Sequence, residues 1–165
     1  MEAEFLYPCD QPRGCNRLLQ GLKDCLQSSA FDTLTFVSAF AKVGPLLRLQ
    51  PLLTQWRRAK KLMTAIIGAD CQGTSIQALD FALTHFDKTY ILQAGPGCTF
   101  HPKIYAFQGS GSAVVSVGSH NLTVGGTELN FEAGARFAFD LPADTEAFRA
   151  CTESGHGAVR ASRRV

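Results

Sequence analysis

The chain has 165 residues and a mass of 17.8 kDa, and 45% of its residues are hydrophobic while 18% are charged. A chain of this length and composition can fold as one globular domain with its own core, which excludes a disordered tail and a fibrous repeat. Lys and Arg number 16 against 14 Asp and Glu, so the formal net charge is only +2. An anionic partner would therefore have to meet local charge rather than a strong basic excess.

The cysteine pattern and the hydropathy indicate where the protein works. The 6 cysteines form no C-x-x-C pair and no regular spacing, which is typical of reduced thiols in a cytoplasmic protein. The first residues, MEAEFLYPCD, are acidic and lack the apolar core of a signal peptide. No apolar run approaches the roughly 20 residues of a membrane-spanning helix, so we expect no integral membrane association. The basic runs at 57–61 and 160–164 are interpreted as solvated faces.

In the first half of the chain, short apolar runs alternate with segments of helical period, which predicts an α/β fold. Leu18, Leu22 and Leu26 share one face of the first helical segment. The predicted helices are 14–29, the stretch that opens at Gly44 and Pro45, and the helix capped by Ser75; the predicted strands are 33–41, 62–67 and 89–93.

From Gly95 onward, short strands follow one another with glycine-rich turns. The predicted strands are 103–108, 113–119 and 130–139, with a loop around Gly125 and Gly126 between the last two and a short helix over 143–151 after them. In the last strand, alternation places Asn130, Glu132, Gly134 and Arg136 on a polar face, and Phe131, Ala133, Ala135 and Phe137 toward the core. We expect one catalytic domain over 1–153 and a flexible, Arg-rich tail over 154–165.

Two other motifs are set aside. The segment 68–75 has the G-x-x-x-x-G spacing of a phosphate-binding loop, but Thr74 stands where that loop needs its lysine, so a plain strand-to-helix turn is the better interpretation. Cys98 and His101 could form half of a zinc site, but no second pair of ligands follows at a suitable spacing. We therefore expect no metal.

A stronger group of polar residues begins at His101-Pro-Lys103. Because side chains alternate along a strand, His101 and Lys103 point to the same side. The turn 118–121, with the sequence GSHN, follows the next apolar strand and supplies the hydroxyl of Ser119 and the carboxamide of Asn121, and Glu132 follows. An imidazole, a carboxylate that can fix its tautomer, and an ammonium and a carboxamide that can hold an anion suffice for phosphoryl transfer without an obligatory metal.

These residues resemble the signature of the phospholipase D superfamily, H-x-K-x4-D followed by G-S-x-N and a glutamate. The matching stretches here are HPKIYAFQ, GSHN and NFE. Their spacing is most similar to the compact one-motif members, the bacterial Nuc-type nuclease and the catalytic domains of BfiI- and NgoFVII-like restriction endonucleases. The resemblance extends from about Phe5 to Phe139, and only the motif region is highly specific.

The resemblance implies a phospholipase D-like mixed β-sheet flanked by helices on both faces, and it implies the role of each site residue. His101 would be the nucleophile that forms a phosphohistidine, Lys103 and Asn121 would bind the phosphate with a contribution from Ser119, and Glu132 would orient the imidazole. No metal or other cofactor is implied. Gln108 occupies the place of the motif's final Asp, which is thought to serve the architecture of the motif more than the chemical step.

The chemistry of this family needs two histidines, one that attacks phosphorus and one that protonates the leaving oxygen, whereas this chain has a single H-x-K motif. We therefore expect a homodimer with one active site at its two-fold interface. The leading hypothesis is a DNA endonuclease of restriction type. Two alternatives remain: a hydrolase of phospholipids or other phosphodiesters with the same fold, and an inactive module of a larger protein that binds nucleic acid or phosphate.

Overall fold

The computed structural model describes residues 1–7, 14 and 17–152. The tail predicted for 154–165, with its basic run, lies outside the described residues. The strands are β1 (Glu2–Leu6), β2 (Thr33–Ser38), β3 (Leu62–Gly68), β4 (Lys88–Leu92), β5 (Lys103–Gln108), β6 (Ser112–Gly118) and β7 (Gly134–Asp140). The helices are α1 (Leu18–Gln27), α2 (Val43–Arg58) and α3 (Ile76–His85), with short turns η2 (Asp70–Gln72) and η3 (Gly125–Leu129) and a last helix at 145–152.

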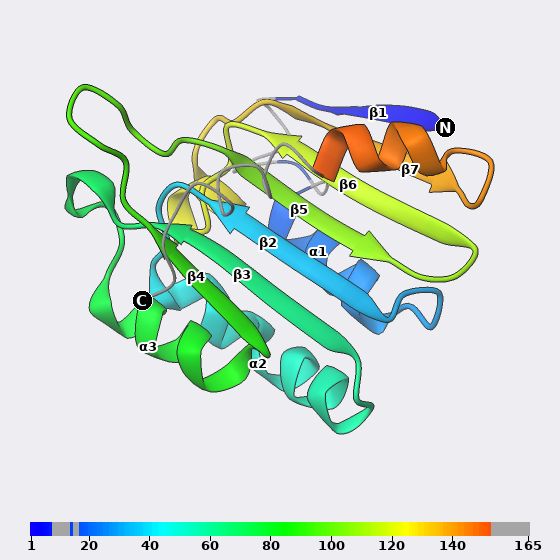
Figure 1. Cartoon of the computed structure of the whole chain (residues 1–165), viewed down its shortest axis with the longest axis horizontal. Helices are drawn as coiled ribbons and strands as arrows, with labels where there is room; N and C mark the ends of the chain where they lie inside the picture. The colour runs from blue at the N-terminus through cyan, green and yellow to red at the C-terminus, as the bar shows by residue number, and fades with distance from the viewer. Residues whose placement is uncertain (8–13, 15–16, 153–165) are drawn as a thin grey trace.

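The strands form one mixed sheet in the order β1-β7-β6-β5-β2-β3-β4 (Figure 1). β2, β3 and β4 are parallel, and α2 and α3 connect them as crossover helices. β5 runs antiparallel to β2, and β6, β7 and β1 continue the sheet in antiparallel pairs. β2 is thus flanked by a parallel and an antiparallel neighbour, and its carboxyl end lies beside the start of β5.

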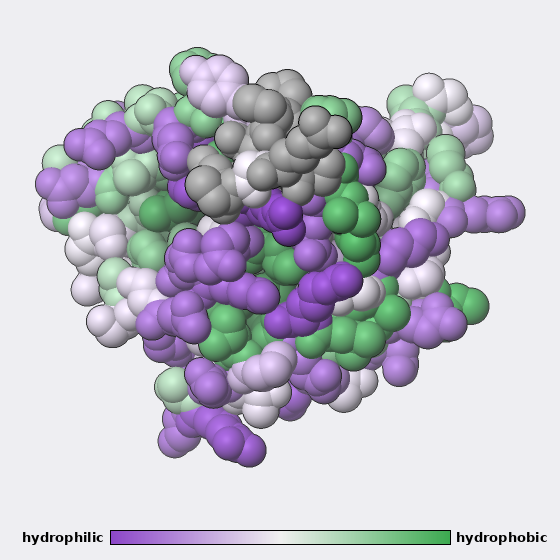
Figure 2. Space-filling model, turned by 180° about the vertical axis from the view of Figure 1, so that it is seen from behind, coloured by the Kyte–Doolittle hydropathy of each residue, from purple (hydrophilic) through white to green (hydrophobic). Residues whose placement is uncertain are grey.

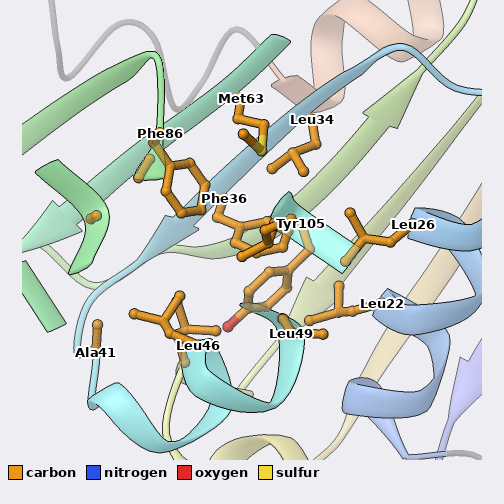
Figure 3. Close-up of a cluster of buried hydrophobic side chains, with 14 of the residues drawn as sticks. Leu22, Leu26, Leu34, Phe36, Ala41, Leu46, Leu49, Met63, Phe86 and Tyr105 are labelled. Atoms are coloured by element: carbon orange, nitrogen blue, oxygen red, sulfur yellow. The ribbon is translucent and has the colours of Figure 1, made fainter. Parts of the chain in front are cut away.

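The main core lies between the sheet and the helices α1, α2 and α3. Leu22 and Leu26 of α1 and Leu46 and Leu49 of α2 pack there against the aromatic side chains of β2 and β5 (Figure 3). The ring of Phe36 contacts those of Phe86, Tyr105 and Phe107, with centroids 5.4 to 6.1 Å apart. Figure 2 shows the molecule from behind relative to Figure 1. The outer surface on that side mixes hydrophilic and hydrophobic side chains, as solvated faces do.

A smaller core covers the opposite face of the sheet. Phe148 of the 145–152 helix packs there on Phe139, and their ring centroids are 5.6 Å apart. Ala106, Ala113 and Val115 complete this cluster. The expected mixed sheet with helices on both faces is therefore confirmed. No helix in the described part of the chain is long and apolar enough to cross a membrane.

Several predicted boundaries differ from the structure. The strand predicted over 33–41 ends at Ser38, because Ser38 Oγ donates a hydrogen bond to the carbonyl of Phe40 and turns the chain. The strand predicted over 130–139 begins only at Gly134, so Asn130 and Glu132 lie in a loop and not on a strand face. Phe131 and Ala133, expected in the core, are exposed, and Ala135 is half-buried. β1 was not predicted at all.

The segment 68–75 is the strand-to-helix turn that its sequence predicted. Thr74 Oγ1 donates to the carbonyl of Gly68 at 2.6 Å and accepts from Ala41 N at 3.1 Å. Ser75 Oγ accepts from Ala78 N at 3.3 Å, which confirms the predicted cap of α3. The side chain of Thr74 thus closes the turn and does not face an open phosphate site.

Replacement of Phe36 by alanine tests the main core. We expect Phe36→Ala to lower the free energy of unfolding by about 3–5 kcal/mol, because the ring loses its three aromatic neighbours and leaves a cavity. Leu83, whose side chain is 61% exposed, supplies the control. Leu83→Ala should change stability by less than about 0.5 kcal/mol in the same denaturant titration, and equal losses in the two variants would contradict the packing described.

Candidate active site

The candidate residues lie at one edge of the sheet, where four strand ends meet. Ser38 at the end of β2 pairs with Lys103 at the start of β5, and Gly118 at the end of β6 pairs with Gly134 at the start of β7. Because β5 is antiparallel to both β2 and β6, its first residues lie between the last residues of those two strands. The topology alone therefore brings the H-x-K segment beside the GSHN turn.

The histidine and the lysine of the motif are in direct contact. Lys103 Nζ lies 2.7 Å from Nδ1 and 2.9 Å from Nε2 of His101, and 2.8 Å from the His101 carbonyl oxygen. The ring of His101 is exposed, whereas Lys103 is only 5% exposed. The exposed imidazole of His101 thus faces solvent with a fixed cation behind it.

Burial lowers the pKa of Lys103, and the negative charge of Glu132 opposes that shift. The cation is therefore held by short contacts in a largely desolvated position rather than on a flexible surface stem. This arrangement provides the local positive charge that the low net charge of the chain does not.

The GSHN turn is fastened to the end of β2. Asn121 Oδ1 accepts a hydrogen bond from Phe40 N at 3.2 Å, and Leu122 N donates to Ser38 Oγ at 2.9 Å. The hydroxyl of Tyr105, on β5, donates to the His120 carbonyl oxygen at 2.9 Å. Asn121 is thus placed by residues that lie more than eighty positions earlier, as well as by its own turn.

Glu132 reaches this edge from the loop before β7. Its carboxylate accepts a hydrogen bond from Ser119 Oγ and another, at 3.3 Å, from Asn130 Nδ2. Ser119 Oγ also accepts from Ala133 N at 3.1 Å. Side-chain bonds of this kind compete with strand pairing, which explains why β7 starts after Glu132. The structure therefore brings Glu132 to Ser119, and its orienting role toward His101 stays a prediction.

His120, the variable residue of the GSHN turn, is buried and only 4% exposed. A Cβ added at Gly118 or Gly134 would come within 3.1 Å of its ring, so this pair of glycines leaves room for the imidazole over the paired ends of the two strands. Burial lowers the pKa of His120, and Glu132 opposes the shift. His120 is therefore a neutral side chain that shares its negative neighbour with Lys103.

Three residues of the site were not found by sequence reasoning. Ser38 and Phe40 hold the GSHN turn, and the ring of Phe40 lies edge-on to that of His101, with centroids 6.0 Å apart. Tyr105 supports the same turn from β5. The signal available in the sequence was a polar residue, Ser38, at the end of an otherwise apolar strand.

Gln108, which stands in place of the motif's Asp, lies at the far end of β5. It is five residues beyond Lys103, about 17 Å at the rise of an antiparallel strand. Gln108 therefore does not contact the site. Among residues 1–7, 14 and 17–152, no group of three or more His, Cys, Asp and Glu could hold a metal ion. Cys98, half of the zinc pair that was set aside, is a free thiol.

Comparison with solved structures places this geometry in a known fold. NucT from Helicobacter pylori superposes with a TM-score of 0.66 at 14% identity, and the match covers 96% of each chain. Nuc from Salmonella typhimurium, a phospholipase D family member, gives a TM-score of 0.63 at 14% identity over 98% of this chain and 96% of its own. The chain has the fold of Nuc. The resemblance drawn from the H-x-K, GSHN and NFE stretches is thus confirmed at the level of the fold.

The Nuc fold also occurs inside larger proteins. Polyphosphate kinase from Porphyromonas gingivalis matches with a TM-score of 0.56 at 10% identity, over 92% of this chain but only 26% of that chain. The match to the two Nuc proteins, by contrast, spans nearly the whole of both partners. No family model matches the sequence, and no curated protein matches it.

The electrostatic link between Glu132 and the buried His120 can be measured directly. We expect the imidazole of His120 to titrate below its ordinary pKa of 6.5. Glu132→Gln should lower this pKa further, because it removes the negative charge that favours the protonated ring. The measurement is an NMR titration of the His120 ring proton.

Glu128→Gln is the matched control for this titration. Glu128 forms an ion pair with Arg48, with the atoms 3.2 Å apart, and does not contribute to the pKa shift of His120. The account requires an unchanged midpoint in this variant. A midpoint in Glu132→Gln that equals or exceeds the wild-type value would show that the carboxylate does not lie beside the ring.

Proposed function

We propose that the protein is a metal-independent phosphodiesterase that cleaves nucleic acid through a phosphohistidine on His101. The substrate that we propose is DNA. The observation that carries the proposal is the pair formed by the exposed imidazole of His101 and the buried ammonium of Lys103. A neutral ring nitrogen can attack phosphorus, and the ammonium behind it can bind a phosphate oxygen.

In the first step, a ring nitrogen of His101 attacks phosphorus, a nitrogen–phosphorus bond forms, and the phosphorus–oxygen bond to the leaving group breaks. A second imidazolium donates the proton that the leaving oxygen takes. Water then attacks phosphorus, the nitrogen–phosphorus bond to His101 breaks, and the proton lost by the water goes to that second imidazole, so both rings return to their starting state.

The remaining residues hold the phosphate and His101. Asn121 uses its oxygen to bind Phe40 N, so its amide nitrogen is the group that can donate to a phosphate oxygen. Ser119 lies on the same turn, and its hydroxyl would bind the phosphate by turning from Glu132, to which it donates in this structure. Glu132, held by Ser119, adds the negative charge that stabilises the buried cation and, in this proposal, orients the imidazole of His101.

The second imidazole in this proposal is His101 of another copy in a homodimer. Among the described histidines, His120 is buried, and His85 is stacked on Phe81 at the end of α3, with ring centroids 4.0 Å apart. Neither is available as the acid. The loop beside the site exposes Leu129 and Phe131, the latter 72% exposed, and a second copy that shares the site would cover these side chains.

Two observations favour nucleic acid as the substrate. The sequence most resembles the one-motif nucleases of the superfamily, and the chain matches Nuc along nearly its whole length. Gln108, which replaces the motif's Asp, lies at the end of β5 away from the site, and this position supports an active enzyme over an inactive module. The restriction type and a cytoplasmic location belong to the same proposal.

The direct test is cleavage of plasmid DNA by the purified protein in EDTA. We expect cleavage by the wild type and loss of at least about 1,000-fold in His101→Ala, because the nucleophile is removed. His85→Ala, remote from the site, is the control and should keep full activity. Specific activity should fall as the protein is diluted below its dimerisation constant.

The proposal fails if no cleavage occurs at any salt concentration or pH, or if His101→Ala cleaves as well as the wild type. Activity that depends on added magnesium would overturn the mechanism, and full specific activity in a monomer would overturn the shared site. DNA binding that weakens steeply with salt, without turnover, would identify an inactive nucleic-acid-binding module instead. Hydrolysis of mixed lipid vesicles but not of DNA would identify the phospholipid as substrate.

A further inference from the structure

Asp70 is a buried carboxylate just beyond the end of β3, at the same edge of the sheet as the site. It is 8% exposed. Its Oδ1 accepts a hydrogen bond from Ala94 N at 3.0 Å, and its Oδ2 accepts one from Phe100 N at 2.8 Å. Both oxygens are thus engaged by backbone amides, and a carboxylate makes such bonds stronger than a neutral acceptor does.

The two amides bound by Asp70 are the two ends of one loop. The segment 94–100, AGPGCTF, contains two glycines and a proline, and Gly97 adopts a positive φ of 79°. A loop of this composition has little intrinsic preference for one conformation. Asp70 closes it by joining its first and last residues, and the residue that follows is His101.

Phe100 is fixed in a second way. Its ring packs against Gly68 at the end of β3, where an added Cβ would lie 3.0 Å from the ring and 2.5 Å from the carbonyl oxygen of Ala39. Three residues after Phe100, Lys103 enters β5 and pairs with Ser38. The backbone of His101 is therefore held between Phe100 on one side and Lys103 on the other, although its own ring is exposed.

We propose that Asp70 is a positioning residue for His101, acting through the amide of Phe100 and the closure of the 94–100 loop. The inference rests on the proposed function, in which His101 attacks phosphorus. A nucleophile gains from being held in line with its target, and a displacement of about 1 Å can cost on the order of 100-fold in rate. Without Asp70, the loop would still connect β4 to β5 but would not fix the place of the imidazole.

The chain offers a matched control for this role. Asp87 also binds a backbone amide, that of Met63 at 2.7 Å, but it lies at the opposite end of β3 and its side chain is exposed. The substitution Asp87→Asn makes the same chemical change at a similar hydrogen bond, away from His101. A general effect on stability should appear in both variants, whereas an effect on His101 should appear only in Asp70→Asn.

Asp70→Asn keeps the shape of the side chain but leaves it one acceptor oxygen, so at least one of the two amides loses its partner. We expect kcat for DNA cleavage to fall about 10- to 100-fold, with KM little changed, because the phosphate is held by Lys103 and Asn121 rather than by Asp70. Asp87→Asn should keep the wild-type kcat. If Asp70→Asn does not fold, Asp70→Glu, which keeps both oxygens but moves them by one methylene, should show the same selective loss of kcat.

A second readout does not depend on catalysis. The ring resonances of His101 in an NMR spectrum report its contact with Lys103, and we expect them to shift or broaden in Asp70→Asn and to remain unchanged in Asp87→Asn. An inactive wild-type protein would overturn the proposed function, and the NMR comparison would still decide the role of Asp70. Wild-type kcat, or wild-type His101 resonances, in a folded Asp70 variant would overturn the positioning role.

Discussion

The Lys103 ammonium is buried at the edge of the sheet, and burying a charge costs free energy unless neighbouring groups compensate for it. Here the compensation comes from the ring and the carbonyl oxygen of His101 and from the negative charge of Glu132. These groups come from the segment just before β5 and from the loop before β7. The local structure around the site therefore has to keep these acceptors close to the Lys103 ammonium.

The topology of the sheet meets this demand. β5 runs antiparallel to β2, so Lys103 at its start lies beside Ser38 at the end of β2. β6 runs antiparallel to β5 in turn, so the GSHN turn at its end lies at the same edge of the sheet. Ser38 and Phe40 bind that turn, and Asp70 fixes the loop that leads to His101. The parallel part of the sheet thus supplies the groups that hold the site, while the antiparallel part supplies most of the groups that would act on a substrate.

Local patterns in the sequence predicted those elements whose signals lie within a few residues. The strand KIYAFQ is found at the predicted residues 103–108, and Ser75 caps α3 as expected, because a period-two pattern and a capping residue are both local. The loop that contains Glu132 was wrongly assigned to a strand, since alternation of residue type continues through it while side-chain bonds from Ser119 hold it away from strand pairing.

Long-range contacts were not accessible in this way. Asp70 binds amides 24 and 30 positions later, and Asn121 binds an amide 81 positions earlier, and no periodicity marks such partners. β1 was missed because its residues, apart from Leu6, are exposed and carry no buried pattern. The site residues were named from their motif, but the groups that hold them in place became visible only in the fold.

The central claim is that His101 becomes covalently bound to the phosphate during turnover. The most direct measurement is mass spectrometry of protein quenched in alkali during cleavage of DNA, with His101→Ala treated in parallel. The account predicts a phosphate-bearing adduct on the peptide that contains His101 in the wild type and none in the variant. An actively cleaving wild-type protein with no adduct on His101 at any quench time, or an adduct on another residue, would contradict it.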